Sequence, residues 1–211
     1  MKRIDKHINK FFYDAIRKPL RTKKEFIILL LNTMKIFYID ESLLIGDGKI
    51  SIIIEKMSRI FYQVENKIFS IVFPFGIEFL KEGYRIYDLD LNVDIDSKLI
   101  SIMIDMINQY ELNEISIEKM LDIYYDVLAD TEDDINVNRA WNILCKLLTI
   151  ELGYIRYDVD QEHAEEIYHP LNHFDINYSN NITYKIGLKK EIVLEDMISM
   201  LDIKQKCNYL E

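Results

Sequence analysis

The 211-residue sequence contains little glycine, proline or cysteine, and it has no long uninterrupted apolar segment. Six glycines and three prolines are too few for a chain of long loops, so the high apolar content predicts a well-packed fold. Cys145 and Cys207 form no C-x-x-C pair, and Cys145 lies in an apolar helical pattern that predicts a buried, reduced thiol. The most apolar segment, 26–39, is shorter than the roughly 18–20 residues that cross a membrane.

Several catalytic signatures are also missing. The turn Gly46-Asp47-Gly48 lacks the Gly-Lys-Ser/Thr sequence of a phosphate-binding loop, which disfavours a nucleotide-dependent enzyme. No serine or cysteine stands in a nucleophile elbow, which disfavours acyl-transfer hydrolases. The first 25 residues are charged throughout and do not resemble a signal peptide. We therefore expect a cytoplasmic protein that needs no cofactor.

Charge is distributed unevenly along the chain. Residues 1–40 carry ten Lys/Arg against four Asp/Glu, a net charge of +6, whereas residues 41–211 carry sixteen against thirty-two, a net charge of −16. The acidic part argues against extended binding to nucleic acid, because such binding requires clustered basic charge. The basic segment leaves a local nucleic-acid contact open, although a solvated face of an N-terminal helix is the favoured interpretation.

Hydrophobic periodicity predicts an α+β fold, with a mainly antiparallel sheet flanked by helices. Helical spacing over 2–18 and a capping box at the start of 22–38 predict a basic N-terminal helical hairpin, residues 1–40, packed on an α+β domain of residues 41–211. Within that domain, the patterns predict strands at 50–54, 60–64, 68–73, 84–96, 154–160, 172–178 and 182–188, and helices at 97–109, 117–129, 136–152 and 191–203.

Residues 84–96 alternate aspartate or asparagine with apolar side chains. They do not match a calcium loop, because Val93 stands where glycine is needed and Leu99 where glutamate is needed. A two-metal aspartate site remains an alternative, but a solvated face of a strand is the simpler interpretation.

The segment 154–188 contains three of the four histidines, His163, His169 and His173. Alternation places its apolar side chains on one face of three strands, because successive side chains of a strand point to opposite faces. If the strands pair as a meander, the other face collects Arg156, Asp158, His173, Asp175, Asn177 and Lys185.

The order R-x-D-x-D, from Arg156 to Asp160, followed by HP-x-x-H, from His169 to His173, resembles a family of bacterial proteins classified as a domain of unknown function. The resemblance covers roughly the last quarter of the chain. It implies an accessory protein of a mobile or defence-associated bacterial locus and no established activity. His163 belongs to neither motif and is left out of the candidate site.

The predicted catalytic residues are His173, His169, Asp175, Arg156 and Asp158. Imidazole exchanges protons near neutral pH, so His173 and His169 could serve as an acid–base pair while Arg156 neutralises a phosphate, assisted by Lys185. This set suits metal-independent phosphodiester cleavage with a ribose 2′-hydroxyl as nucleophile. Two alternatives stay open: a metal held by His169, His173 and one carboxylate, and a purely structural ion pair across the strands.

We therefore carry two functional hypotheses. One is an RNA-cleaving enzyme of a defence or toxin-type locus; the other is a non-catalytic interaction subunit of a multi-protein bacterial defence complex. The expected partner is a protein encoded by a neighbouring gene or a second copy of the chain, with possible nucleic acid at the basic segment and no membrane.

Overall fold

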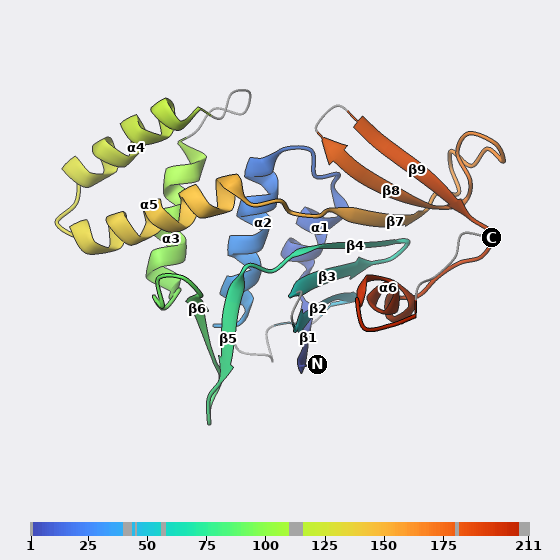
Figure 1. The fold of residues 1–211 in the computed structure, drawn as a ribbon, viewed down its shortest axis with the longest axis horizontal. Coiled ribbons are helices and arrows are strands. Elements are labelled where there is room, and N and C mark those ends of the chain that lie inside the picture. Colours follow the sequence, from blue (N-terminus) through green and yellow to red (C-terminus); the bar gives the residue numbers. More distant parts are fainter. Residues whose placement is uncertain are drawn as a thin grey trace. The chain divides into compact units, whose positions relative to one another are not determined.

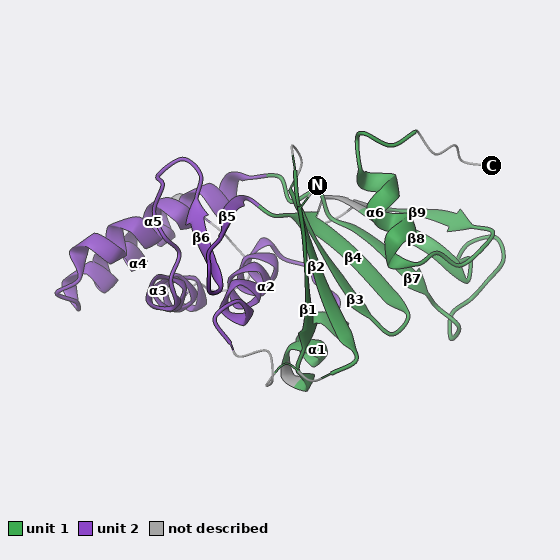
Figure 2. Ribbon diagram, turned by 90° about the horizontal axis from the view of Figure 1, so that it is seen from below, with its two compact units in different colours: residues 1–18, 41–73, 151–211 green, residues 19–40, 74–150 purple. Residues whose placement is uncertain are grey.

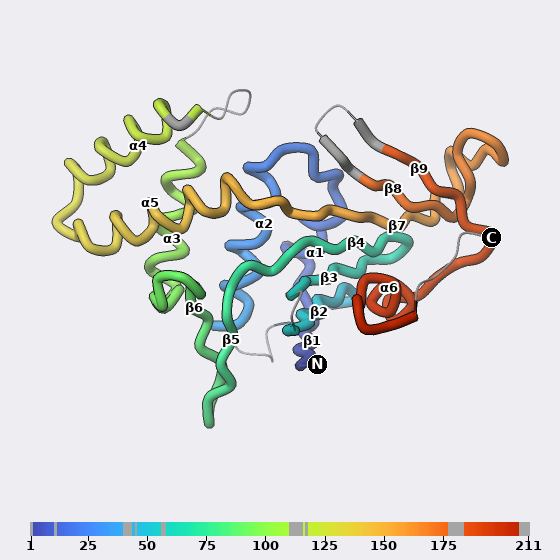
Figure 3. The backbone as a smooth tube through the Cα atoms, in the orientation of Figure 1, coloured from blue at the N-terminus to red at the C-terminus, as the bar shows by residue number. Residues whose placement is uncertain are grey.

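The chain folds into two compact units (Figure 2). The computed structural model describes residues 2–39, 44, 46–55, 58–109, 116–179 and 182–206. Unit 1 comprises residues 1–18, 41–73 and 151–211, and unit 2 comprises residues 19–40 and 74–150. The chain therefore leaves unit 1 twice and returns to it twice, a path that can be followed in Figure 3.

Unit 1 is built on a seven-stranded sheet in which every neighbouring pair is antiparallel (Figure 1). The strands follow one another across the sheet in chain order, although residues 74–150 separate the fourth from the fifth. In that order they are β1 (Lys2–Ile8), β2 (Gly48–Ile54), β3 (Arg59–Val64), β4 (Lys67–Val72), β7 (Ile155–Val159), β8 (Asn172–Ser179) and β9 (Ile182–Leu188).

The two faces of this sheet are covered by different helices. Helix α6 (Leu194–Leu201) packs Met197 and Ile198 against an apolar cluster that includes Phe61, Tyr157 and Phe174. Helix α1 (Lys10–Arg17) also packs against β3, and Figure 2 shows it on the side of the sheet opposite α6. The strand β3 is buried along almost its whole length, including both inward- and outward-facing positions, as expected for a strand covered on both faces.

The predicted N-terminal helical hairpin is wrong. Residues 2–8 form β1, which pairs along its whole length with β2, and only the following segment is helical. Ile4 and Ile8 are four residues apart, a spacing that fits one face of a helix and one face of a strand equally well. The residue between them on that face is Lys6, which is itself buried, so no apolar alternation marked the strand.

Unit 2 combines four helices with a two-stranded sheet among the described residues. Helix α3 (Ser97–Asn108) packs against both α2 (Lys23–Ile36) and α5 (Asp134–Thr149), and the core consists of side chains such as Leu30, Met103 and Leu144. Cys145, expected to be buried, is half-buried, and Cys207 lies outside the described residues. The elements are α2 (Lys23–Ile36), β5 (Phe75–Phe79), β6 (Tyr84–Asp88), α3 (Ser97–Asn108), α4 (Ile117–Ala129) and α5 (Asp134–Thr149).

Two local predictions for unit 2 had different outcomes. The capping box at the start of α2 is confirmed: the Glu25 backbone N–H donates to Thr22 Oγ1 over 3.2 Å, and Glu25 Oε2 accepts from the Thr22 N–H over 2.8 Å. The single strand expected over 84–96 is too long, because Asp88 ends β6 by accepting hydrogen bonds from the backbone of Asp90 and Leu91. Asp88 is buried and paired with Lys146, so the expected solvated face does not include it.

The α+β class and the antiparallel sheet flanked by helices are confirmed. The division at residue 40 differs from the two compact units, because residues 1–18 contribute a strand and a helix to unit 1. Among the described residues, no helix combines the length and the apolar character that a membrane crossing requires.

Lys67 fixes the C-terminal end of α1 to the sheet. Its ammonium group lies 2.9 Å from the carbonyl oxygen of Ile16 and 3.1 Å from that of Lys18, groups left without intrahelical partners. Burial lowers the pKa of Lys67 to about 8; the nearby charge of Arg156 adds to the lowering, and Asp158 opposes it.

We predict a pH-dependent contribution of Lys67 to stability. The unfolded chain holds the Lys67 proton up to the pKa of 10.5, and the folded chain loses it at about 8, so the folded state gains relative stability as the pH rises between these values. Compared with Lys67→Met, the wild-type free energy of unfolding should increase by up to about 3 kcal/mol across this window in urea titrations. A difference that stays constant with pH would contradict the prediction.

Candidate functional site

The polar groups predicted for one face of the last three strands do converge. In the sheet register, Arg156 lies opposite Asp175, Asp158 opposite His173, and Asp175 opposite Lys185. The alternate residues of these strands pack toward α6, as the parity of the sequence predicts. Asn177 was expected on the polar face, but its side chain lies outside the described residues.

His173 is buried, with a side chain only 1% exposed, and both of its ring nitrogens are engaged within the chain. Nδ1 lies 2.8 Å from the carbonyl oxygen of Pro170. A carbonyl only accepts, so Nδ1 carries the proton and Nε2 carries a lone pair. The ammonium group of Lys185 lies 2.9 Å from Nε2 and donates to it. The ring is therefore a neutral link between a loop carbonyl and a lysine.

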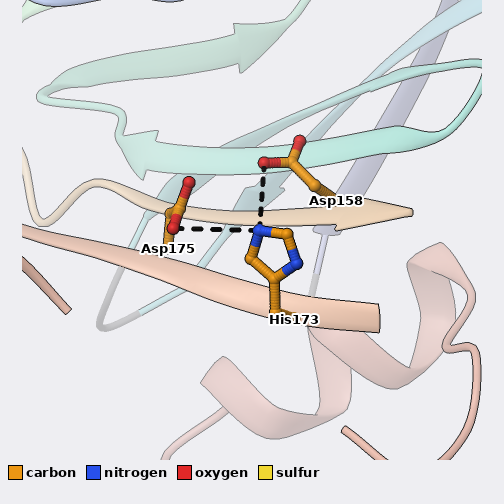
Figure 4. Close-up of side chains that lie close together, drawn as sticks. All are labelled: Asp158, His173 and Asp175. Atoms are coloured by element: carbon orange, nitrogen blue, oxygen red, sulfur yellow. Dashed lines mark ion pairs between the residues drawn. The ribbon is translucent and has the colours of Figure 1, made fainter. Parts of the chain in front are cut away.

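Two carboxylates flank the Nε2 edge of this ring (Figure 4). His173 Nε2 lies 4.0 Å from Asp158 Oδ2 and 3.9 Å from Asp175 Oδ1. Arg156 joins them, with Nε 2.6 Å from Asp158 Oδ2 and a terminal nitrogen paired with Asp175 Oδ2. Lys185 completes the set, because its ammonium is also 3.0 Å from Asp175 Oδ1. Two positive and two negative groups therefore neutralise one another across three strands.

Tyr154 is a member of this cluster that sequence reasoning missed. Burial raises its pKa to about 12, although the charge of Arg156 acts in the opposite direction. Burial lowers the pKa of Arg156, but Tyr154, Asp158 and Asp175 outweigh it and hold that pKa above its usual value. Strand alternation could have identified Tyr154, because it precedes Arg156 by two residues and so shares its face.

The HP-x-x-H motif has a local structural explanation. Pro170 supplies the carbonyl that fixes the tautomer of His173, and its ring lies over Gly187 of β9. A Cβ at Gly187 would stand 2.7 Å from Pro170 Cγ, so only glycine lets the proline lie against the strand. The His169 ring contacts the His173 ring edge-on, with centroids 4.7 Å apart, and thus lies at the rim of the cluster as expected.

His169 points its Nε2 at a different carboxylate. This nitrogen lies 3.1 Å from Asp160 Oδ2, an ion-pair distance, and it is buried without a hydrogen-bond partner among the described residues. The same carboxylate meets His163, whose Nδ1 is 3.1 Å from Asp160 Oδ1. Asp160 and His163, which the motifs did not single out as site residues, therefore come together with His169.

The ion pairs among Arg156, Asp158, His173, Asp175 and Lys185 limit what this cluster can bind. The donor atoms of Asp158, His173 and Asp175 lie within 4.8 Å of one another, close enough to hold a metal ion. The Lys185 ammonium already lies against two of these donors, and Arg156 neutralises both carboxylates. A divalent ion would have to displace one cation and add charge to a balanced, mostly buried cluster, which is electrostatically costly.

No protein-family model matches the chain, and comparisons with curated proteins and with solved structures give no match. The resemblance of the C-terminal quarter to a bacterial family of unknown function therefore stays a prediction.

We predict that Asp175→Asn lowers the free energy of unfolding by about 3–5 kcal/mol, because it leaves Arg156 and Lys185 without their shared, buried counter-charge. Adding Lys185→Met should recover part of the loss, which a double-mutant cycle in denaturant measures as a coupling energy. The exposed Asp14 offers a matched control, and Asp14→Asn should change stability by less than about 0.5 kcal/mol. Equal effects of the two Asp→Asn changes would contradict the structural role of Asp175.

Proposed function

We propose that this chain is a non-catalytic interaction subunit of a multi-protein bacterial complex, of the accessory kind that the C-terminal resemblance implies. The observation that carries the proposal is the loop between β7 and β8, where Ile167 is 78% and Tyr168 77% exposed. In this proposal the buried cluster beneath the loop positions it and takes no part in chemistry.

The loop has a defined conformation rather than a loose one. At its base, the Asp160 N–H donates to the Leu171 carbonyl over 2.9 Å and extends the β7–β8 ladder by one bond. Near its tip, Glu165 and His169 exchange two backbone hydrogen bonds of 2.7 and 2.9 Å. Ile167 and Tyr168 lie between these two residues and are thus presented on a closed turn. A pre-formed loop loses little conformational entropy on binding, which favours recognition.

The tip of the loop exposes two large side chains next to each other, one apolar and one amphipathic. An isoleucine and a tyrosine exposed by more than three quarters leave apolar area in water that a partner surface can bury, and Leu171 at the base is 43% exposed. Tyrosine is enriched among the residues that dominate binding energy, because it combines a large apolar body with a hydrogen-bonding tip.

The charge around the tip indicates the chemistry of the partner. The loop carries Glu162, Glu165 and Glu166, all exposed, and the sequence has no lysine or arginine between Arg156 and Lys185. Complementary potentials steer association and disfavour wrong partners. We therefore propose a protein partner that presents an apolar pocket with a basic rim, encoded by a neighbouring gene.

The test is co-expression of the chain with each neighbouring gene product, followed by affinity measurement on the purified pair. We predict that Ile167→Ser with Tyr168→Ser weakens the complex by at least about 2 kcal/mol, roughly thirtyfold. Ile135, which is 66% exposed in unit 2, offers a matched control, and Ile135→Ser should leave the affinity unchanged. Binding of the double variant with wild-type affinity, or no complex with any neighbouring product, would contradict the proposal.

A second candidate function is metal-independent cleavage of RNA, favoured by the convergence of His173, Asp175, Arg156 and Lys185 on one sheet face. Here the two cations would bind a phosphate, and His169 and His173 would transfer protons. The buried position of His173 weighs against this candidate, because a substrate has to displace Lys185 before it reaches Nε2.

The two candidates differ in one measurement, RNA cleavage by the purified chain in the presence of a chelator. The interaction proposal predicts no cleavage above a buffer control. The enzyme candidate predicts cleavage that His169→Ala lowers by about 10²–10⁴-fold, the usual contribution of a general acid or base. His169 is only partly buried, so this variant tests chemistry with little loss of stability.

A further inference from the structure

We propose that Asp160, His163 and His169 bind one divalent transition-metal ion, with zinc the best fit, in the loop between β7 and β8. This inference goes beyond the proposed interaction function and does not depend on it. Asp160 and His169 belong to the two sequence motifs and His163 belongs to neither. The site replaces the metal alternative in which His173 was a ligand.

The distances around Asp160 match the edges of a metal coordination shell. Its Oδ1 lies 3.1 Å and its Oδ2 3.2 Å from His163 Nδ1, and its Oδ2 lies 3.1 Å from His169 Nε2. Ligands held about 2.0–2.2 Å from a zinc ion lie about 3.0–3.5 Å from one another. The carboxylate is therefore at ligand spacing from each imidazole nitrogen taken singly, while the two rings stand 6.2 Å apart between centroids.

His169 Nε2 provides an independent indication of a ligand. This atom is buried and makes no hydrogen bond within the described part of the chain, although it faces a carboxylate at 3.1 Å. Buried polar atoms are nearly always satisfied, so an unsatisfied imidazole nitrogen calls for an explanation. A metal ion bound between this nitrogen and Asp160 would give the nitrogen a partner.

The backbone holds Asp160 and His169 in place, and His163 has room to adjust. Asp160 and His169 are each fixed by backbone hydrogen bonds, to Leu171 and to Glu165. The backbone N–H of His163 donates to Asp160 Oδ1 over 3.1 Å, while its side chain is 70% exposed. The two imidazole centroids lie 6.2 Å apart, so the exposed His163 ring has to turn inward to bring all three donors to one ion.

Charge separates this site from the neighbouring cluster of Asp158, His173 and Asp175. There, two carboxylates are already neutralised by Arg156 and Lys185. At Asp160 the two partners are imidazoles, which are neutral when they bind a metal, and the rest of the loop adds only glutamates. A divalent cation is thus attracted to this loop and not to the adjacent sheet face.

The donor set selects the class of metal. Two imidazoles and one carboxylate suit first-row transition metals, whereas calcium and magnesium prefer oxygen ligands. Three protein ligands leave at least one coordination position for water or for a group of a binding partner.

The test is calorimetric titration of the full chain with zinc chloride, after metal has been removed with a chelator. We expect one zinc ion per chain, and we expect His163→Ala and Asp160→Asn each to weaken binding at least tenfold. The exposed position of the His163 side chain means that its removal does not disturb folding. His7 is also exposed but lies on β1, so His7→Ala should bind zinc like the wild type.

Two results would overturn the site. One is the absence of zinc binding by the wild-type chain; the other is unchanged binding by His163→Ala, which would assign the metal to other groups such as the cysteines. Calcium chloride in place of zinc chloride should give no binding, and equal affinity for calcium would also contradict the donor set. The titration contains no partner protein, so a failure to bind zinc leaves the interaction proposal unaffected. A failure to bind a partner likewise leaves the metal site unaffected.

Discussion

The polar face of the C-terminal strands depends on one buried carboxylate. Asp175 is 8% exposed and pairs with Arg156 on the preceding strand and Lys185 on the following one, so it joins β7, β8 and β9 by charge as well as by the backbone ladder. Removal of a partner from such a network leaves an uncompensated charge, which costs far more than the pair contributes by itself. His173 lies inside the network as a neutral link, and its position determines how the adjoining loop is held.

The alternation of the sequence was sufficient to predict which side chains share this face. Arg156, Asp158, His173 and Asp175 could be placed together because strand parity is strict and each strand is short. Strand parity does not reveal how deeply a side chain is buried, however. The burial of His173 follows from the Pro170 turn and from its packing on Gly187, contacts between residues that no sequence period relates. For the same reason His163 was missed, since it lies in a loop where neither helical nor strand spacing applies. Asp160 ends the R-x-D-x-D motif but was not assigned to the candidate site.

The errors in the fold have similar physical origins. The first strand was mistaken for a helix because Lys6 occupies an inward position that an apolar residue would normally mark. The two compact units carry no local sequence signal, because residues 19–40 and 74–150 form one unit by contacts distant in sequence. Local signals with a direct chemical cause, such as the Thr22–Glu25 capping box, were reliable. The basic character of residues 1–40 is therefore distributed over both units and does not form a separate arm.

The central claim is that His173 is buried and links the Pro170 carbonyl to the Lys185 ammonium through its two ring nitrogens. Its most direct test is the tautomer of the His173 ring, measured by nitrogen-15 NMR on the histidine-labelled chain. The structure predicts a proton on Nδ1, held by the Pro170 carbonyl, and a hydrogen-bonded lone pair on Nε2 that reports the Lys185 ammonium. A proton on Nε2, or the averaged signals of a ring in contact with solvent, would contradict this account and return His173 to the list of catalytic candidates.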